Sequence, residues 1–221
     1  MNIRDRAKNQ LPTVLLTLIS IVQALALELL WGKILESGTL HVWSLGSITD
    51  WLQVVATFTG LVLVWVLYAN NIMRFRWVPN TLDSIAPFFI GLLQFSLVNW
   101  IGPSSVGKWI MTLAVIFALM ATIMQHIMRM AREDGDNDPF FAGLSRATWR
   151  DFLDVIVISA VMFACGLAIQ VTGYRGVGTP IFVLVCWGLL MLQLIRAHRF
   201  WMVGVNTERG RTRQSSNEAA D

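Results

Sequence analysis

Six long apolar runs alternate with short polar segments along the chain. Each run reaches about 20 residues, the length that an α-helix needs to cross roughly 30 Å of hydrocarbon. The runs occupy residues 11–35, 48–70, 82–101, 106–128, 152–173 and 180–203. This pattern predicts an all-α integral membrane protein in which residues 1–203 form a six-transmembrane-helix bundle. Residues 204–221 are polar without an apolar period, and we expect them to form a disordered cytoplasmic tail.

The distribution of basic residues indicates how the bundle is oriented. The 221-residue chain is 55% hydrophobic and 14% charged, so little polar sequence lies outside the six runs. Six spans place both termini on one side, and that side carries fourteen of the 17 Lys and Arg residues. Cytoplasmic loops hold the excess of basic residues, which predicts cytoplasmic termini in a multi-pass inner (plasma) membrane protein. The net charge of +3 follows from this topology and indicates no nucleic-acid partner.

Several acidic residues stand where helices are expected to begin. Three motifs place a carboxylate three residues after a capping side chain, as in a capping box: Ser47–Asp50, Asn80–Asp83 and Thr148–Asp151. Pro12 is expected in the first turn of the first span, where its missing N–H has no helical partner. The pattern therefore assigns the three aspartates to helix capping rather than to function.

Residues typical of catalytic or metal sites are sparse. The three histidines are His41, His126 and His198, and none stands at metal-ligand spacing from Cys, Asp or Glu. The sequence has no phosphate-binding glycine loop, nucleophile elbow or HExxH motif. Cys165 and Cys186 both lie in predicted spans, and we interpret them as small packing residues. We therefore expect neither enzymatic activity nor a cofactor or metal ion.

Three polar side chains within the spans form a candidate site. An ionisable residue inside a span usually faces the bundle interior or a water-filled cavity, and Glu28 is the one carboxylate well inside a span. At 1.5 Å per residue, Glu28, Gln53 and Gln94 should share a layer roughly 10 Å from the outer ends of their helices. Glu28 is therefore expected to point into the bundle, near both glutamines.

A stripe of small and hydroxylated residues follows the first span. The stripe contains Thr13, Thr17, Ser20 and Ala24, continues outward to Leu27 and Trp31, and is flanked by Gln23 and Glu28. Such a face could line a path through the membrane. Alternatively, its polar groups hydrogen-bond to neighbouring helices.

Other spans carry small residues at helical spacing. Such residues allow two helix backbones to approach closely. The predicted packing faces are Ala56 with Gly60, Ala114 with Ala118, and Ala160 with Ala164 and Ala168.

Three segments within about the first 95 residues follow a pattern known from one family. They are the small, apolar run from Ala24 to Leu30 with its paired leucines, the second span with Trp65, Tyr68, Asn70 and Asn71, and the third with Asn80, Pro87 and Phe88. In these features the chain resembles the bacterial six-helix relatives of the endolysosomal potassium channel. Where that family has a Phe-Ser-Asp signature, this chain has Leu18, Ile19 and Ser20.

The resemblance implies a tetrameric pore lined by the first span, with Leu27 or Leu30 as an apolar constriction. The missing aspartate leaves potassium conduction without its signature residue. We expect a homo-oligomeric, cation-channel-like protein in the lipid bilayer, with a monovalent cation as its partner. Its pore or polar intramembrane residues would be Ser20, Gln23, Leu27, Glu28, Leu30, Gln53 and Gln94. The alternatives are a non-catalytic membrane scaffold or assembly protein, and a small-solute transporter with a polar site at Glu28, Gln53 and Gln94.

Overall fold

The computed structural model of the protein describes residues 2–42, 44–141 and 148–218, which are helical or in connecting turns. The long helices are α1 (Ile3–Glu36), α2 (Leu45–Arg74), α3 (Thr81–Asn99), α4 (Val106–Arg132), α6 (Leu153–Thr172) and α7 (Gly178–Glu218). Short helices in the connections are η1 (Gly38–His41), η2 (Gly135–Asn137), α5 (Asp138–Phe141) and η3 (Trp149–Phe152). Six described helices are long and apolar enough to cross a membrane. The predicted all-helical architecture with six span-length helices is confirmed, and the length and apolar composition of these helices indicate a multi-pass membrane protein.

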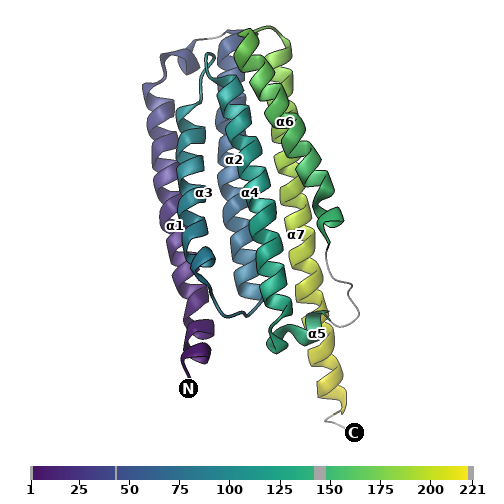
Figure 1. Cartoon of the computed structure of the whole chain (residues 1–221). Helices are drawn as coiled ribbons and strands as arrows, with labels where there is room; N and C mark the ends of the chain where they lie inside the picture. The colour runs from purple at the N-terminus through teal and green to yellow at the C-terminus, as the bar shows by residue number, and fades with distance from the viewer. Residues whose placement is uncertain (1, 43, 142–147, 219–221) are drawn as a thin grey trace.

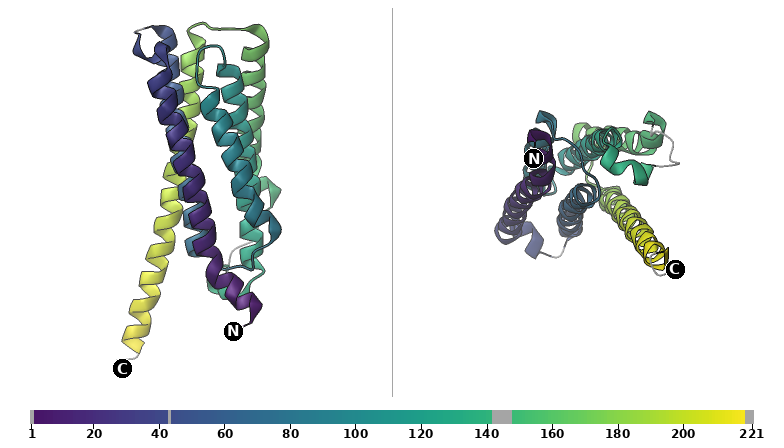
Figure 2. Two further views of the ribbon diagram at one scale, coloured as in Figure 1. Left: turned by 90° about the vertical axis from the view of Figure 1, so that its left-hand side faces the viewer. Right: turned by 90° about the horizontal axis from the view of Figure 1, so that it is seen from below.

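The long helices stand side by side, with both termini at the same end of the bundle (Figure 1). α2 packs along α7, α4 packs along α6, and α1 packs against α2 and α3. Side chains from α2, α3, α4 and α7 meet in the interior. α1 and α6 therefore lie at opposite margins of the bundle (Figure 2).

Two helices extend beyond the predicted spans. α1 begins at Ile3 because Asn2 and Asp5 form a capping box, each side chain accepting from the other's backbone N–H. Pro12 therefore lies inside α1, and its predicted first-turn position is wrong. At the other end of the chain, α7 continues to Glu218, beyond the predicted end of the sixth span. Extending an existing helix adds one hydrogen bond per residue without a new nucleation step, which favours this continuation.

The predicted caps are confirmed at one of three positions. Asn80 and Asp83 form a capping box at the start of α3. α2 begins earlier than expected, because the Ser44 side chain accepts from the backbone N–H of Ser47 and makes Ser44 the cap. α6 begins at Leu153 with Phe152 as its N-cap residue, so Thr148 does not stand at its start.

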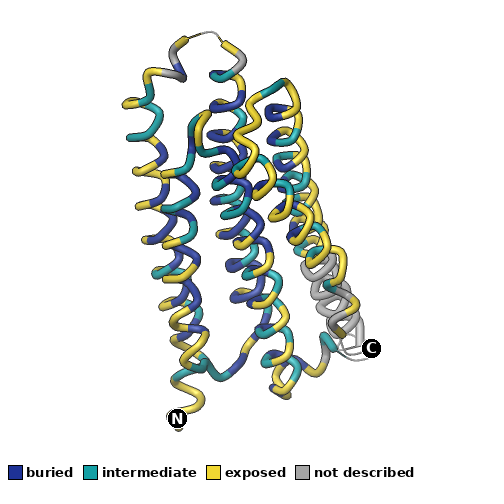
Figure 3. The backbone as a smooth tube through the Cα atoms, turned by 45° about the horizontal axis from the view of Figure 1, so that its top comes forward, coloured by how far each residue is buried: buried dark blue, intermediate teal, exposed yellow. Residues whose placement is uncertain are grey.

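Glycine contacts bring α4 and α6 together. A Cβ atom on Gly107 would lie 2.6 Å from the carbonyl oxygen of Gly166, so the two backbones touch. The predicted small-residue faces are only partly buried: Ala56 and Ala114 are packed. Ala118, Ala160, Ala164 and Ala168 are exposed, against expectation. Figure 3 shows how much of α6 remains uncovered.

Candidate functional site

Glu28 lies on the outer face of α1, away from the other helices. The residues that α1 buries are Leu11, Leu15, Ile19, Val22, Gln23, Ala26 and Leu30. Glu28 is exposed, and so is every residue of the predicted stripe: Thr13, Thr17, Ser20, Ala24, Leu27 and Trp31. At about 100° per residue, the stripe and Glu28 stand opposite the buried side of α1. The prediction that Glu28 points into the bundle beside Gln53 and Gln94 is therefore wrong.

The packing of α1 explains this placement. α1 packs along one side of the bundle, mainly against α2 and α3. Ile19 and Ala26 are fully buried there, whereas Leu25, Leu27 and Leu29 remain exposed. Because apolar residues surround α1, hydrophobicity alone does not identify its buried side. The stripe faces outward, with one link to the bundle at its edge: the Ser20 hydroxyl accepts from the indole N–H of Trp65 on α2 at 3.3 Å.

Gln23 and Gln94 form a buried amide pair between α1 and α3. Nε2 of Gln23 donates to Oε1 of Gln94 at 3.0 Å, and Nε2 of Gln94 donates back at 3.4 Å. Both side chains are almost completely buried. The pair satisfies polar groups that would be costly in hydrocarbon, so it joins the two helices rather than lining a path.

Gln53 belongs to a different polar region, near the η1 end of α2. Its Oε1 accepts from the backbone N–H of Gly102 at 3.1 Å, in the turn between α3 and α4. One turn further along α2, Thr57 accepts from the indole N–H of Trp109 at 3.0 Å. Glu28, Gln53 and Gln94 therefore do not form the common site that the transporter hypothesis requires.

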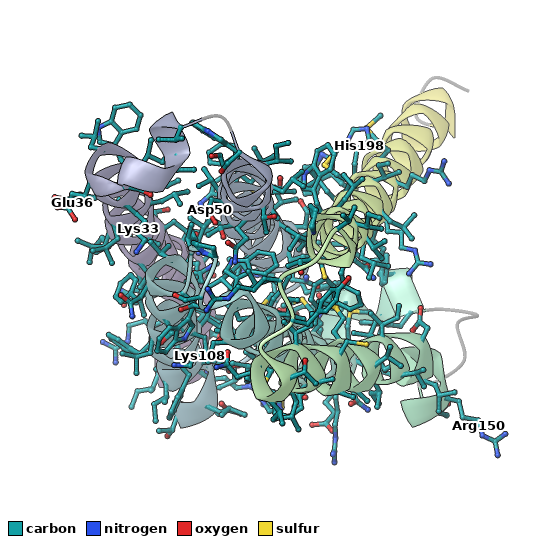
Figure 4. The ribbon with its side chains drawn as sticks, turned by 90° about the horizontal axis from the view of Figure 1, so that it is seen from above. Lys33, Glu36, Asp50, Lys108, Arg150 and His198 are labelled. Carbon is teal, nitrogen blue, oxygen red and sulfur yellow. The ribbon has the colours of Figure 1, made fainter. Side chains whose placement is uncertain are left out.

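The sequence pattern predicts that Asp50 caps a helix, whereas in the structure Asp50 is fully buried within α2. Seen from above, Asp50 lies among the helices, whereas Glu36 and Arg150 lie at the margin (Figure 4). Asp50, Gln53 and Thr57 follow one helical face at i, i+3 and i+7. This spacing is visible in the sequence and could have identified Asp50 as an interior residue.

A second buried polar cluster surrounds Asp83 at the opposite end of the bundle. Asp83 Oδ2 accepts from the indole N–H of Trp77 at 3.1 Å and from the backbone N–H of Asn80 at 2.9 Å. Nε2 of His126, on α4, lies 3.7 Å from Asp83 Oδ1 and 2.9 Å from Asn80 Nδ2. The cluster caps α3 and fastens it to α4. The sequence has no signal for this pairing, since His126 is 43 positions from Asp83.

A small cavity adjoins this cluster. It has a volume of about 10 Å³ and is lined by Tyr68, Asp83 and His126 together with apolar side chains. The buried Tyr68 hydroxyl has no hydrogen-bond partner among the described residues. A space of this size is at the lower limit for one water molecule.

An ionic cluster ties the start of α1 to the end of α4. Nζ of Lys8 lies 2.6 Å from Asp134 and 3.1 Å from Asp136. Burial of Asp134 disfavours its charged form, but the hydrogen bond from Lys8 and the positive charges of Lys8 and Arg4 outweigh that effect. The pKa of Asp134 is consequently lowered from its usual value.

The interior of the bundle holds a small, largely apolar cavity. The central cavity between α2, α3, α4 and α7 has a volume of about 30 Å³. Gln94 is its polar lining residue, and the rest of the lining is apolar apart from Gly60. Leu30 is buried against the bundle, whereas Leu27 is exposed on the outer face of α1. Of the predicted site residues, Ser20, Leu27 and Glu28 therefore share the outer face, and Gln23, Leu30, Gln53 and Gln94 are interior.

No protein-family model, curated protein or solved structure matches this chain. The resemblance to the potassium channel family stays a prediction.

Proposed function

We propose that the protein assembles as a homo-oligomer in which the outer faces of α1 line a central path for monovalent cations. The observation that supports this most directly is the exposed stripe with Thr13, Thr17 and Ser20, flanked by the exposed Glu28, on one face of a helix long and apolar enough to span a membrane. Helix faces that meet lipid are normally apolar, whereas intramembrane polar residues face protein or water. Copies of α1 around an axis would give the stripe such an environment.

The position of Glu28 strengthens this argument. Glu28 stands eight residues before the end of α1, about 12 Å along the helix axis. A charged side chain near the centre of a span costs about 2.5–3.5 kcal/mol on insertion scales, and less near the interface. In the part of the chain that the structure describes, Glu28 has no ion-pair partner. A water-filled path would remove most of this cost.

Leu27 is the apolar candidate for a constriction. It is exposed next to Glu28, whereas Leu30 is buried and is excluded from a path along the outer face. A ring of leucines can hold ions back until the ring wets or rearranges. Glu28 would attract cations beside that ring.

Ion flux in liposomes tests the proposal. Reconstituted protein should pass potassium, sodium or protons, and Glu28→Gln should reduce cation flux severalfold without loss of folded protein. Glu36→Gln is the matched control, because Glu36 is an exposed carboxylate at the end of α1. Equal flux through wild type and Glu28→Gln would contradict the assignment of Glu28.

Assembly through α1 can be measured separately. With Cys165 and Cys186 replaced by Ala, Ala24→Cys should form disulfide-linked dimers in membranes. Leu92→Cys, exposed on α3 outside the stripe, should not. Cross-linking through Ala24 without ion flux would favour the scaffold alternative, in which α1 faces form only a packing interface.

A further inference from the structure

A groove between α4 and α6 is independent of the proposed path along α1. It has a volume of about 350 Å³. Its α4 wall runs from Ala114 through Ala118 to Gln125, and its α6 wall runs from Ile156 to Phe163, with Phe152 at its end. The walls diverge towards the end of the bundle that holds the termini (Figure 1).

The groove is closed by contact at one end and open at the other. Towards the η1 end of the bundle, α4 and α6 touch at Gly107 and Gly166. From Ala114 to Gln125 the groove extends eleven residues along α4, about 16 Å. One leaflet of a bilayer has about 15 Å of hydrocarbon. The groove therefore matches the depth of one leaflet.

The lining suits hydrocarbon rather than a polar solute. Two hydroxyl groups line the groove, and both donate to carbonyls of their own helices: Thr122 to Ala118 at 2.9 Å and Ser159 to Val155 at 2.8 Å. Their hydrogen-bonding capacity is thus largely used within the helix. The remaining walls are mainly Ala, Val, Ile and Phe side chains. Their small alanines leave the space that a slender chain would fill.

Polar and basic groups stand at the open end. Gln125 lines the groove there, and Arg129 follows it by one turn on the same helical face. On the other wall, Arg150 precedes Phe152 by two residues and is exposed. Because α6 has just the length of one span, its first residues mark the membrane boundary. Arg129 and Arg150 therefore lie near headgroup depth.

Arg129 has an acidic neighbour but remains accessible. Glu133 lies 3.4 Å from Arg129, but both side chains are largely exposed. An exposed ion pair of this kind contributes at most about 1 kcal/mol, so a phosphate can compete for Arg129. Asp154 pairs instead with Arg196 of α7.

We propose that this groove binds one acyl chain of an anionic glycerophospholipid from the leaflet on the side of the termini. The lipid phosphate would lie against Gln125 and Arg129. Basic pockets between transmembrane helices are a recognised mode of binding for such headgroups.

Thermal unfolding of the full chain in detergent tests the site. Phosphatidylglycerol should raise the Tm by several degrees more than phosphatidylcholine with the same acyl chains. Ala118→Trp should fill the groove and remove the difference, while Ala164→Trp, exposed on α6 outside the lining, should retain it. Arg129→Gln should reduce the preference for phosphatidylglycerol without changing the response to phosphatidylcholine.

Two further measurements keep the test decisive. Native mass spectrometry should find phosphatidylglycerol retained by wild type and Ala164→Trp but lost from Ala118→Trp. This measurement reports lipid binding directly, so it applies even if a variant has a lower Tm. Inorganic phosphate alone should give no shift in Tm. An equal response to the two lipids, retention by Ala118→Trp, or a full shift with inorganic phosphate would each overturn the lipid site.

Discussion

The side-chain amides of Gln23 and Gln94 bond to each other in both directions across the boundary between α1 and α3. This pair is a direct polar link between a marginal helix and the rest of the bundle. One turn away along the same boundary, a Cβ atom on Gly91 would lie 2.8 Å from Cγ1 of Val22, so the two helices approach closely beside the pair. The position of α1, and with it the direction of its outer face, depends on this contact.

Replacing one glutamine of the amide pair should destabilise the protein more than replacing both. Gln23→Leu leaves the Gln94 amide buried without its partner and should lower the free energy of unfolding by about 1–2 kcal/mol. The double variant Gln23→Leu/Gln94→Leu should recover part of that loss, because no polar group is then stranded. Unfolding in detergent, analysed as a double-mutant cycle, measures the coupling. Additive losses in the two single variants would show that the amides do not act as a pair.

The crossing of α4 and α6 should not tolerate a side chain. Gly166→Leu must separate the backbones, since even a Cβ atom would lie 2.8 Å from the Gly107 carbonyl oxygen. We expect a destabilisation of at least about 1–3 kcal/mol, as for an overpacked core. Ala164→Leu is the control, because Ala164 is exposed on α6. If Gly166→Leu had the same Tm as the wild type, the close contact between α4 and α6 would not lie at Gly166.

The Asp134–Lys8 cluster should make stability depend on pH in the acid range. The pKa of Asp134 is lowered in the folded protein, so its contribution is present above the unfolded value, about 3.9, and is lost as the pH falls through the folded value. Asp134→Asn should therefore destabilise the protein at pH 7, by about 1.5–3 kcal/mol for a hydrogen bond to a charged group. The difference from wild type should shrink below about pH 4.

Melting curves of wild type and Asp134→Asn between pH 7 and pH 3.5 check this dependence. Glu133→Gln serves as a control for general charge effects, because Glu133 is exposed. A destabilisation by Asp134→Asn that stays constant across this range would contradict the role of the ionised carboxylate.

The orientation in the membrane can be tested by labelling. With Cys165 and Cys186 replaced, a cysteine at Ser216 should react only from the cytoplasmic side and one at Thr39 only from outside. This expectation rests on the excess of basic residues around the termini and on the two termini lying at the same end. Labelling of position 216 from outside would invert the topology and the leaflet assigned to the groove.

Local patterns predicted the elements of the fold but misplaced some of their ends. The six helices follow from run length and hydropathy, which are properties of each segment alone. Helix starts were predicted too late where a capping residue stands earlier in the chain, as with Asn2 before Pro12 and Ser44 before Ser47. A capping side chain stabilises whichever start its hydrogen bond reaches, and several candidates along the chain can satisfy that condition.

Run length and periodicity were enough to predict six span-length helices and a hydroxylated stripe on the first of them, because both properties depend only on neighbouring residues. That the stripe faces away from the bundle while Gln23 and Leu30 face inward follows from how the helices pack. The same holds for the contacts of Asp83 with His126 and of Gly107 with Gly166. These pairings depend on which helices pack together. In hydrocarbon, apolar residues around a helix give no preference for one side, so close packing and partners for buried polar groups choose the side that is covered.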